Sequence, residues 1–313
     1  MRPTYRFLIN PAAGLRFFKH TLDLIYREFD GHPVLTEVCV LRGPGEAGRL
    51  AHEAAVLGLD AVVVVGGDGT INEAAAGLLG LGSDEGPSGL AGSRTRLGLV
   101  PHGTGNGFAR GLGIPLDPLQ ACEVLKAGAE RRIDVGLVRA GGAERCFVNL
   151  LGVGMDAWVA RAANRLRPLG KVSGLLRYAA AGAMSLTGFR PSLVRACWEE
   201  GQIAKRTYLL ALANTEQYGM QARIAPGADP SDGRFDLVWV GPQPLWSLAA
   251  SLPSLFKGRR LGIAEYGQAT SLRLESGDGS LMPYHVDGEP AGDLPIDVSL
   301  LKGRLRVIVP APR

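Results

Sequence analysis

The sequence has no long hydrophobic run and few aromatic residues. None of its apolar stretches reaches the eighteen or so residues that a membrane-spanning helix requires. Aromatic side chains make up 6% of the 313 residues, and no basic run alternates with them as a surface for single-stranded nucleic acid would require. The net charge of +4 is also small for a nucleic-acid-binding protein. We therefore expect a soluble or peripheral protein with no nucleic-acid partner.

Cysteine is scarce, and its spacing is not that of a metal site. The four cysteines, Cys39, Cys122, Cys146 and Cys197, form no C-x-x-C pair and lie near no pair of histidines. This pattern predicts reduced thiols in a cytoplasmic protein rather than disulfides or metal ligands. Residues 1–5 lead directly into a strand-like segment, so we expect no signal peptide.

The most informative stretch lies between residues 61 and 79. Five consecutive apolar residues, Ala61–Val65, predict a strand covered on both faces, as in the middle of a parallel sheet. Gly-Gly-Asp-Gly at 66–69 follows, and an alanine-rich helical stretch begins at Thr70. In this arrangement backbone N–H groups hold phosphate, and the glycines leave room for it. Thr70 and Glu73 have the spacing of a capping box, which predicts that the helix begins at Thr70.

Asp68 distinguishes this loop from the common phosphate-binding motifs. The segment is neither a Walker A loop nor the Rossmann G-x-G-x-x-G. A carboxylate beside phosphate predicts a Mg²⁺ ion between the two, or a proton acceptor for an attacking hydroxyl. The alternative is a tight turn in which Asp68 only bonds to the backbone.

The first 132 residues alternate strand and helix patterns. Strand-like residues 5–9, 34–41 and 61–65 are each followed by a helical pattern, and a further strand at 96–100 leads into a second glycine loop at 101–107. This alternation predicts a doubly wound α/β domain with ligands at the carboxyl ends of its strands, where the two glycine loops should lie side by side. The Gly/Ser-rich residues 80–95 predict a surface loop.

From residue 133 the pattern changes to short alternating strands. They predict an antiparallel β-sandwich that occupies 133–313, with two helical inserts at 158–186 and 244–256. The strand-like segments are 133–138, 146–153, 194–198, 206–214, 235–240, 271–274 and 305–309.

The insert at 244–256 permits two interpretations. It is apolar, carries Trp246 and Phe256, and is followed by three cations at 257, 259 and 260. We favour a helix that covers the sandwich and leaves its basic end exposed. The alternative is a helix that rests on an anionic lipid surface.

Six motifs, taken together, resemble the diacylglycerol kinase catalytic superfamily, which includes sphingosine, ceramide and bacterial lipid kinases. Their order and approximate spacing are similar to those of the bacterial members, although Gly-Gly-Asp-Gly alone also occurs in NAD kinases and phosphofructokinases. The motifs are Asn-Pro-Ala-Ala-Gly at 10–14, Gly-Gly-Asp-Gly-Thr at 66–70 with Asn-Glu at 72–73, Pro-His-Gly-Thr-Gly-Asn at 101–106, Phe-Val-Asn at 147–149 with Gly-Met-Asp-Ala at 154–157, Ala-Pro at 225–226 with Asp-Gly at 232–233, and Val-Asp-Gly-Glu at 286–289.

The resemblance implies ATP and acceptor in a cleft between an α/β and a β-sandwich domain. It implies transfer of the γ-phosphoryl group of ATP, with Mg²⁺, to a lipid hydroxyl. Asp287 is then the candidate general base with Glu289 beside it, and Asp68 and Asp232 belong to the acidic network around the metal. By itself, Asp287-Gly288 is a signal for a β-turn. The residues expected around the nucleotide are Asn10, Gly66, Gly67, Gly69, Thr70, Glu73, Gly103, Thr104 and Asn106.

Two features depart from the family pattern. Many bacterial members have an acid where this chain has Gly107, which weakens the implied Mg²⁺ network. The chain also ends at Arg313, soon after its last predicted strand, so we expect no return of the C-terminus into the first domain.

The sequence therefore predicts a cytoplasmic ATP-dependent lipid kinase. Peripheral attachment to the inner face of the membrane is left open, as are the oligomeric state and the acceptor: diacylglycerol, a sphingoid base, phosphatidylglycerol or an isoprenoid alcohol. Two alternatives also stay open, a soluble-metabolite kinase of the NAD kinase type and a nucleotide-binding regulatory module that has lost catalysis.

Overall fold

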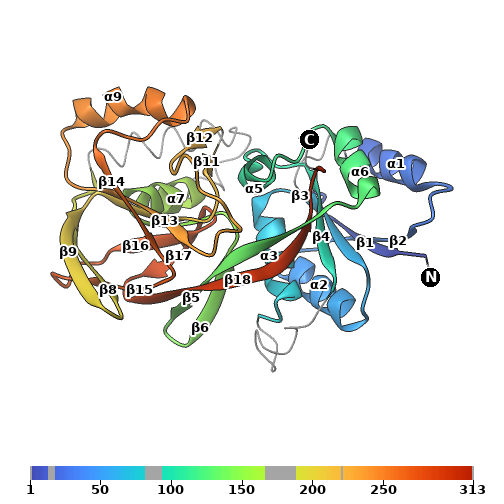
Figure 1. The fold of residues 1–313 in the computed structure, drawn as a ribbon, viewed down its shortest axis with the longest axis horizontal. Coiled ribbons are helices and arrows are strands. Elements are labelled where there is room, and N and C mark those ends of the chain that lie inside the picture. Colours follow the sequence, from blue (N-terminus) through green and yellow to red (C-terminus); the bar gives the residue numbers. More distant parts are fainter. Residues whose placement is uncertain (1, 13–17, 82–93, 166–187, 220, 312–313) are drawn as a thin grey trace. The chain divides into compact units, whose positions relative to one another are not determined.

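The computed structural model describes residues 2–12, 18–81, 94–165, 188–219 and 221–311 (Figure 1). Contacts divide the chain into a first unit, residues 1–135 with 302–313, and a second unit, residues 136–301. Most of the surface loop expected at 80–95, and the greater part of the helical insert expected at 158–186, lie outside the described residues. No helix among the described residues is long and apolar enough to cross a membrane.

The first unit is built on a parallel sheet. Its strands lie in the order β2-β1-β3-β4, and β3 is buried at every position, as its unbroken apolar run predicts. Helices α1 and α6 pack on one face, and α2 and α3 cover the other (Figure 1). The predicted doubly wound α/β fold is thereby confirmed. The elements are β1 (Thr4–Ile9), α1 (Phe18–Phe29), β2 (Leu35–Val40), α2 (Glu46–Val56), β3 (Ala61–Gly66), α3 (Asp68–Leu78), β4 (Arg96–Pro101), α5 (Gly107–Gly111) and α6 (Pro118–Ala127).

The second unit is an antiparallel β-sandwich, as predicted. Strands β14-β13-β10-β7-β16-β17 form one sheet, and β18, β15, β8 and β9 supply the facing strands. Inward residues of both, including Leu210, Val153, Val194 and Leu274, form one buried core. The elements are β5 (Glu130–Ala140), β6 (Ala143–Phe147), β7 (Leu150–Gly154), α7 (Met155–Arg165), β8 (Ser192–Trp198), β9 (Gly201–Thr207), β10 (Leu209–Ala213), β11 (Gln217–Gly219), β12 (Ala222–Arg223), β13 (Phe235–Val240), α9 (Leu245–Phe256), β14 (Ala264–Ala269), β15 (Ser271–Ser276), β16 (Pro283–Val286), β17 (Glu289–Asp293) and β18 (Ile296–Ile308).

The C-terminal strand overturns one expectation. The first half of β18 pairs with β15, whereas Val307 pairs in parallel with Leu97 of β4, and residues 302–313 belong to the first unit. The C-terminus therefore does return to the first unit, and the expectation that it would not was wrong. The pattern at 305–309 is only the end of one 13-residue strand that serves both units.

Removal of residues 302–313 should unfold the first unit. It deletes Leu305, Val307 and Ile308, which are at most 2% exposed. Burial of side chains of this size contributes about 1.5–3 kcal/mol each, against a total stability of about 5–15 kcal/mol. Thermal unfolding followed by circular dichroism measures the effect, with a chain that lacks only residues 310–313 as the control. Equal melting temperatures for the two truncated chains would show that this strand is dispensable.

Candidate active site

Main-chain hydrogen bonds extend beyond the parallel strands and align three loops. The Asn10 N–H donates to the Val65 carbonyl at 3.0 Å, and the His102 N–H donates to the Gly66 carbonyl at 2.8 Å. Because these bonds lie at the carboxyl ends of β1, β3 and β4, they bring Asn10 beside the first glycine loop and the first glycine loop beside the second. The expected neighbourhood of the two loops is thereby confirmed.

The two glycine loops touch through their backbones. A Cβ atom added to Gly67 would lie 3.1 Å from the Gly103 Cα, and one added to Gly103 would lie 2.6 Å from the Gly67 Cα. Glycine is thus required here for the packing of loop against loop. The sequence predicted a different role for these glycines, namely that they leave room for phosphate beside the backbone.

Asp68 joins the first glycine loop to the helix after the second. Its two carboxylate oxygens accept hydrogen bonds from the N–H groups of Gly107 and Phe108, each at 3.1 Å. These are N–H groups at the start of α5, where no helical carbonyl is available to accept them. Asp68 thus bonds to backbone N–H groups of the second loop, and the carboxylate retains acceptor positions for a further partner.

The predicted capping box is not formed. Helix α3 begins at Asp68, two residues before the predicted start, and no side chain caps it. The Thr70 hydroxyl instead accepts a hydrogen bond from the Asn10 amide at 2.8 Å, and the Glu73 carboxylate accepts the N–H of Gly45 at 2.9 Å. Thr70 and Glu73 thus connect α3 to two neighbouring loops rather than to each other.

Asn106 closes the second glycine loop on itself. Its backbone is left-handed, with φ of 51°, and its buried side-chain amide accepts the Gly103 N–H at 2.8 Å and donates to the Gly103 carbonyl at 2.9 Å. Thr104 lies exposed inside this closed turn, and Gly69 is exposed in the first loop. The first unit therefore brings together, in two fixed loops, most of the residues that were expected around a nucleotide.

In the second unit, Asp287 anchors a separate set of motif residues. It occupies the turn between β16 and β17, with a left-handed φ of 47°. Its carboxylate accepts the N–H groups of Val148, Asn149 and Leu150 at 2.9, 3.0 and 2.8 Å. These bonds explain why the single strand expected at 146–153 is divided into β6 and β7.

A buried histidine–aspartate pair supports this turn. The His285 Nε2 and the Asp156 carboxylate lie 3.1 Å apart, and both residues are at most 7% exposed. Because the His285 Nδ1 accepts the Gly288 N–H at 3.1 Å, the network assigns the proton to Nε2, which donates to Asp156. A Cβ atom on Gly152 would lie 2.0 Å from Asp156, so only glycine fits beneath the pair.

His285 was not predicted from the sequence as a site residue. Its partner Asp156 lies 129 residues away, and a lone histidine in a strand-like run gives no sign of one. The usable signal was position, since His285 stands two residues before Asp287 and Asp156 belongs to the motif at 154–157.

The two carboxylates expected to hold metal, Asp68 and Asp232, belong to different units. Among the described residues no group of three His, Cys, Asp or Glu side chains is arranged to hold an ion. Asp232 is exposed and accepts the Arg234 N–H at 2.9 Å. Burial raises the pKa of the nearby Asp236 carboxyl, and the charge of Asp232 acts in the same direction. Asp68 belongs to the other unit, so a joint metal site of Asp68 and Asp232 stays a prediction.

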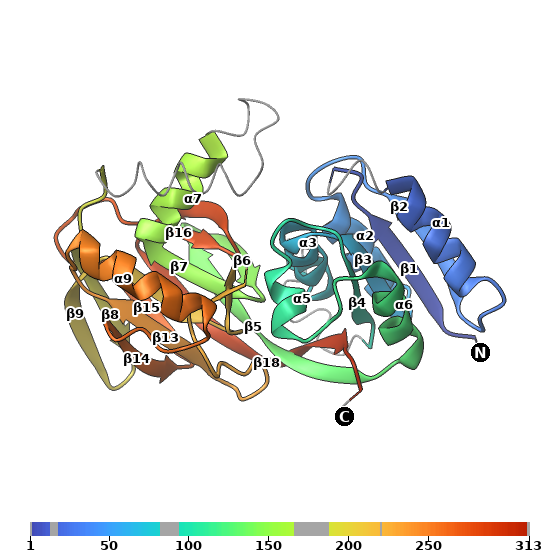
Figure 2. The same ribbon diagram turned by 90° about the horizontal axis from the view of Figure 1, so that it is seen from above.

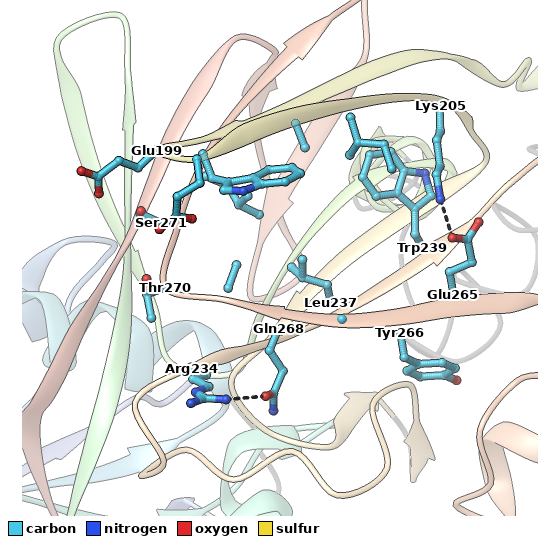
Figure 3. Close-up of a pocket in the computed structure, with 17 residues that line it drawn as sticks. Glu199, Lys205, Arg234, Leu237, Trp239, Glu265, Tyr266, Gln268, Thr270 and Ser271 are labelled. Carbon is cyan, nitrogen blue, oxygen red and sulfur yellow. Dashed lines mark hydrogen bonds and ion pairs between the residues drawn. The ribbon is translucent and has the colours of Figure 1, made fainter.

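A cavity of about 500 Å³ in the second unit lies apart from these motifs (Figure 3). It is lined by residues of β8, β9, β13, β14 and β15, among them Trp239, and an ion pair between Lys205 and Glu265 links its edge strands β9 and β14. In the sheet order, β14 is at one edge and β16, which precedes Asp287, lies four strands away. No residue of the six motifs lines this cavity.

Comparison with known proteins identifies the family. The model of the diacylglycerol kinase catalytic domain matches residues 4–138, and that of the YegS C-terminal NAD kinase β-sandwich-like domain matches residues 149–309. A probable lipid kinase, YegS-like, from Chromohalobacter salexigens is 31% identical over 85% of this chain and 81% of its own. The chain belongs to the diacylglycerol kinase catalytic family. The resemblance inferred from the six motifs is thereby confirmed.

Other relatives span the whole chain. The diacylglycerol kinase of Bacillus subtilis (strain 168) is 28% identical over 97% of this chain and 96% of its own. A crystal structure of a diacylglycerol kinase from Bacillus anthracis str. Sterne superimposes with a TM-score of 0.70 at 19% identity, covering 98% of this chain and 97% of that one. At that identity the structure shows a shared fold. The kinase family thus accounts for both the α/β domain and the β-sandwich.

Substitution of Asp68 by asparagine should loosen the start of α5 in this kinase-family domain. Asparagine keeps one acceptor oxygen but turns an NH₂ group toward either Gly107 or Phe108, and an unsatisfied buried donor costs about 1–3 kcal/mol. Hydrogen exchange at the N–H groups of Gly107 and Phe108 should become faster.

The matched control is Asp117→Asn. Asp117 caps α6 through the single N–H of Gln120, a task for which asparagine and aspartate are equivalent. We expect little change in exchange at α6. Unchanged protection of α5 in Asp68→Asn would contradict the structural role of the carboxylate.

Two substitutions of His285 should separate its two hydrogen bonds. In His285→Asn the amide oxygen takes the place of Nδ1 and still accepts the Gly288 N–H, whereas His285→Gln places an amide NH₂ near Nε2 and still donates to Asp156. Each variant should lose about 1–3 kcal/mol of unfolding free energy for the group left unpaired.

Hydrogen exchange at Gly288 distinguishes the two variants. Protection should persist in His285→Asn and disappear in His285→Gln. The exposed His20 provides the control, since His20→Asn should leave the unfolding free energy unchanged. Equal protection of Gly288 in both His285 variants would show that Nδ1 does not hold the turn.

Proposed function

We propose that this member of the kinase family transfers the γ-phosphoryl group of ATP to the hydroxyl of a lipid alcohol. The observation that carries the proposal is the pair of glycine loops that Asp68 joins at the carboxyl ends of the parallel strands. Such loops expose backbone N–H groups at helix starts, which is where phosphate binds in α/β folds. Phosphoryl transfer needs mainly positioning and neutralisation of charge, so a lysine in the loop is not essential.

The nucleotide is proposed to bind along these two loops. Asn10 and Thr70 already form one hydrogen-bonded pair there, and the exposed Gly69 and Thr104 offer backbone and hydroxyl groups to solvent. The complete proposed set is Asn10, Gly66, Gly67, Gly69, Thr70, Glu73, Gly103, Thr104 and Asn106.

Asp287 is the proposed general base. Three backbone N–H groups bind the Asp287 carboxylate, two at Oδ1 and one at Oδ2, and they fix the orientation of Oδ2, the oxygen proposed to act as the base. In the proposed step this oxygen takes the proton of the lipid hydroxyl as the alcohol oxygen bonds to the γ-phosphorus. The bond from that phosphorus to the β-phosphate oxygen breaks, and ADP leaves. Glu289, exposed two residues later, adds negative charge beside the base.

Mg²⁺ fits the chemistry of the available donors, because Asp68 and Asp232 are carboxylates, the ligand type that this ion prefers. Each carboxylate keeps acceptor positions beyond its observed bonds to backbone N–H groups. When bound with ATP, the ion would neutralise the charge of the phosphates.

Diacylglycerol is the first acceptor to test. The Bacillus subtilis relative carries the name diacylglycerol kinase, whereas the Chromohalobacter relative is named only as a probable lipid kinase. The acceptor within the class of lipid alcohols is therefore a proposal of its own, to be resolved by a screen of solubilised lipids with labelled ATP.

Asp287→Asn should lower turnover of ATP with diacylglycerol in mixed micelles by about 10²–10⁴-fold, the usual contribution of a general base. The affinity for ATP, measured by calorimetry, should change little. The control is Asp278→Asn, because Asp278 also accepts backbone N–H bonds in a turn, from Leu193 and Ser280, but belongs to no motif. Its turnover should stay close to that of the wild type.

Three results would contradict parts of this proposal. Turnover of Asp287→Asn equal to that of Asp278→Asn would remove Asp287 from the base role. A joint loss of ATP affinity and turnover would assign it to metal or nucleotide binding. Phosphorylation of NAD without phosphorylation of any lipid would replace the lipid kinase with a soluble-metabolite kinase.

A further inference from the structure

Helix α9 (Leu245–Phe256) presents an apolar face to solvent. It contains no charged residue, and Trp246, Phe256 and Leu252 are 75%, 60% and 53% exposed. Ala249, Ala250 and Pro253 are exposed between them. With 3.6 residues per turn, Trp246, Ala249, Ala250, Pro253 and Phe256 lie along one stripe, and Leu252 borders it.

The opposite face of α9 explains how the helix is held on the sandwich. Leu248 and Leu255 pack against the buried cluster on the outer side of the sheet that contains β13 and β10. Figures 1 and 2 show the helix lying over that side of the sheet. The half-buried Ser251 donates its hydroxyl to the Ser247 carbonyl at 2.8 Å. The helix therefore does cover the sandwich, as the sequence analysis favoured. Among the described side chains of α9, this packing uses Leu248 and Leu255, and it gives no reason for an outer face of tryptophan, leucine and phenylalanine.

The residues that follow α9 are basic. Lys257, Arg259 and Arg260 are exposed, and no Asp or Glu occurs between residues 237 and 264. Arg223 approaches the same end of the helix, since a Cβ atom on Gly258 would lie 3.2 Å from its side chain, and Arg223 is paired with Glu216 at 3.3 Å. An exposed apolar stripe is thus followed directly by three positive charges, of which Arg260 lies over the Tyr266 ring at 4.8 Å and acts on the charge of Asp236.

We propose that α9 docks this protein on a membrane surface that contains anionic phospholipid. The helix lies parallel to the surface, Trp246, Leu252 and Phe256 enter the boundary between head groups and acyl chains, and the three cations contact lipid phosphates. The charges favour this partner over a second copy of the chain, because a symmetric dimer through α9 would bring two basic segments together. The inference goes beyond the proposed function, although a lipid acceptor would be met at the same surface.

Co-sedimentation with vesicles tests the proposal. We expect the full-length protein to bind vesicles of phosphatidylcholine mixed with phosphatidylglycerol and to bind pure phosphatidylcholine weakly. Neutralising Lys257, Arg259 and Arg260 together to glutamine should reduce binding to the mixed vesicles by about 100-fold, since each cation near an anionic surface contributes about 1 kcal/mol, or about fivefold, and the three factors multiply. The difference should shrink at high salt, where the charges are screened.

The apolar stripe needs a separate variant. Trp246→Ser combined with Phe256→Ser should reduce binding to both kinds of vesicle. The matched control carries Leu281→Ser and Arg195→Gln, which change an 81% exposed leucine and an exposed arginine elsewhere in the same unit. Control and wild type should bind alike. Equal vesicle binding by all variants would overturn the proposal, and so would an α9-dependent dimer in sedimentation velocity without vesicle binding.

Fluorescence quenching identifies the side chain that enters the membrane. Brominated lipids should quench part of the tryptophan emission of the wild type, and this quenching should fall in Trp246→Phe, which keeps an apolar ring and should still bind. Unchanged quenching in Trp246→Phe would place another tryptophan in the lipid and overturn the assignment to α9.

An activity assay separates this inference from the proposed function. If both hold, the charge variant should phosphorylate a short-chain lipid dissolved as monomers at the wild-type rate, and a vesicle-embedded lipid more slowly. Vesicle binding without phosphorylation of any lipid would reject the proposed function and leave the docking intact. Equal rates on embedded lipid, together with equal vesicle binding, would reject the docking and leave the proposed function intact.

Discussion

The arrangement of the two glycine loops in the first unit depends on one carboxylate and two backbone N–H groups. Asp68 accepts the N–H groups of Gly107 and Phe108, and in doing so it ties the loop after β3 to the helix that follows β4. The two glycine loops also meet through backbone contact between Gly67 and Gly103 and through the hydrogen bond from the His102 N–H to the Gly66 carbonyl. An acid in a glycine loop is thus compatible with phosphate binding, because part of its charge is already neutralised by the N-terminus of α5.

The second unit also contains a carboxylate that connects two segments by accepting backbone N–H groups. Asp287 accepts three consecutive N–H groups at 148–150, and the pair of His285 and Asp156 holds the turn from the other side through the N–H of Gly288. Asp68 and Asp287 are therefore also structural residues. Any loss of activity on substitution of either combines chemistry with loop geometry, which is why control acids with similar backbone bonds, such as Asp278, are informative.

The sequence predicted the larger features because they depend on local patterns. The run Ala61–Val65 is buried throughout, and the helical period at 18–29 matches α1. Pairing at long range was not predictable in the same way. The gap between β6 and β7 exists because Asp287, more than a hundred residues later, accepts the N–H groups there, and the single strand β18 serves two units. The capping box failed because Thr70 has a better-placed partner in Asn10 than in its own helix.

Gly107 is the residue that raised the possibility of lost catalysis. The family resemblance implied an acid at this position, and its absence suggested a nucleotide-binding module without catalysis. In the structure, however, residue 107 contributes its backbone N–H to Asp68, a bond that any residue except proline makes. The geometry of the loop therefore does not depend on the missing side chain, and Asp68, Asn106 and Asp287 all retain the contacts that position them. Decay would be expected to release such buried polar contacts first, because each costs free energy once its partner is lost. The contacts of these residues thus show no loss of loop geometry at Gly107, and the missing acid alone gives no reason to infer a module without catalysis.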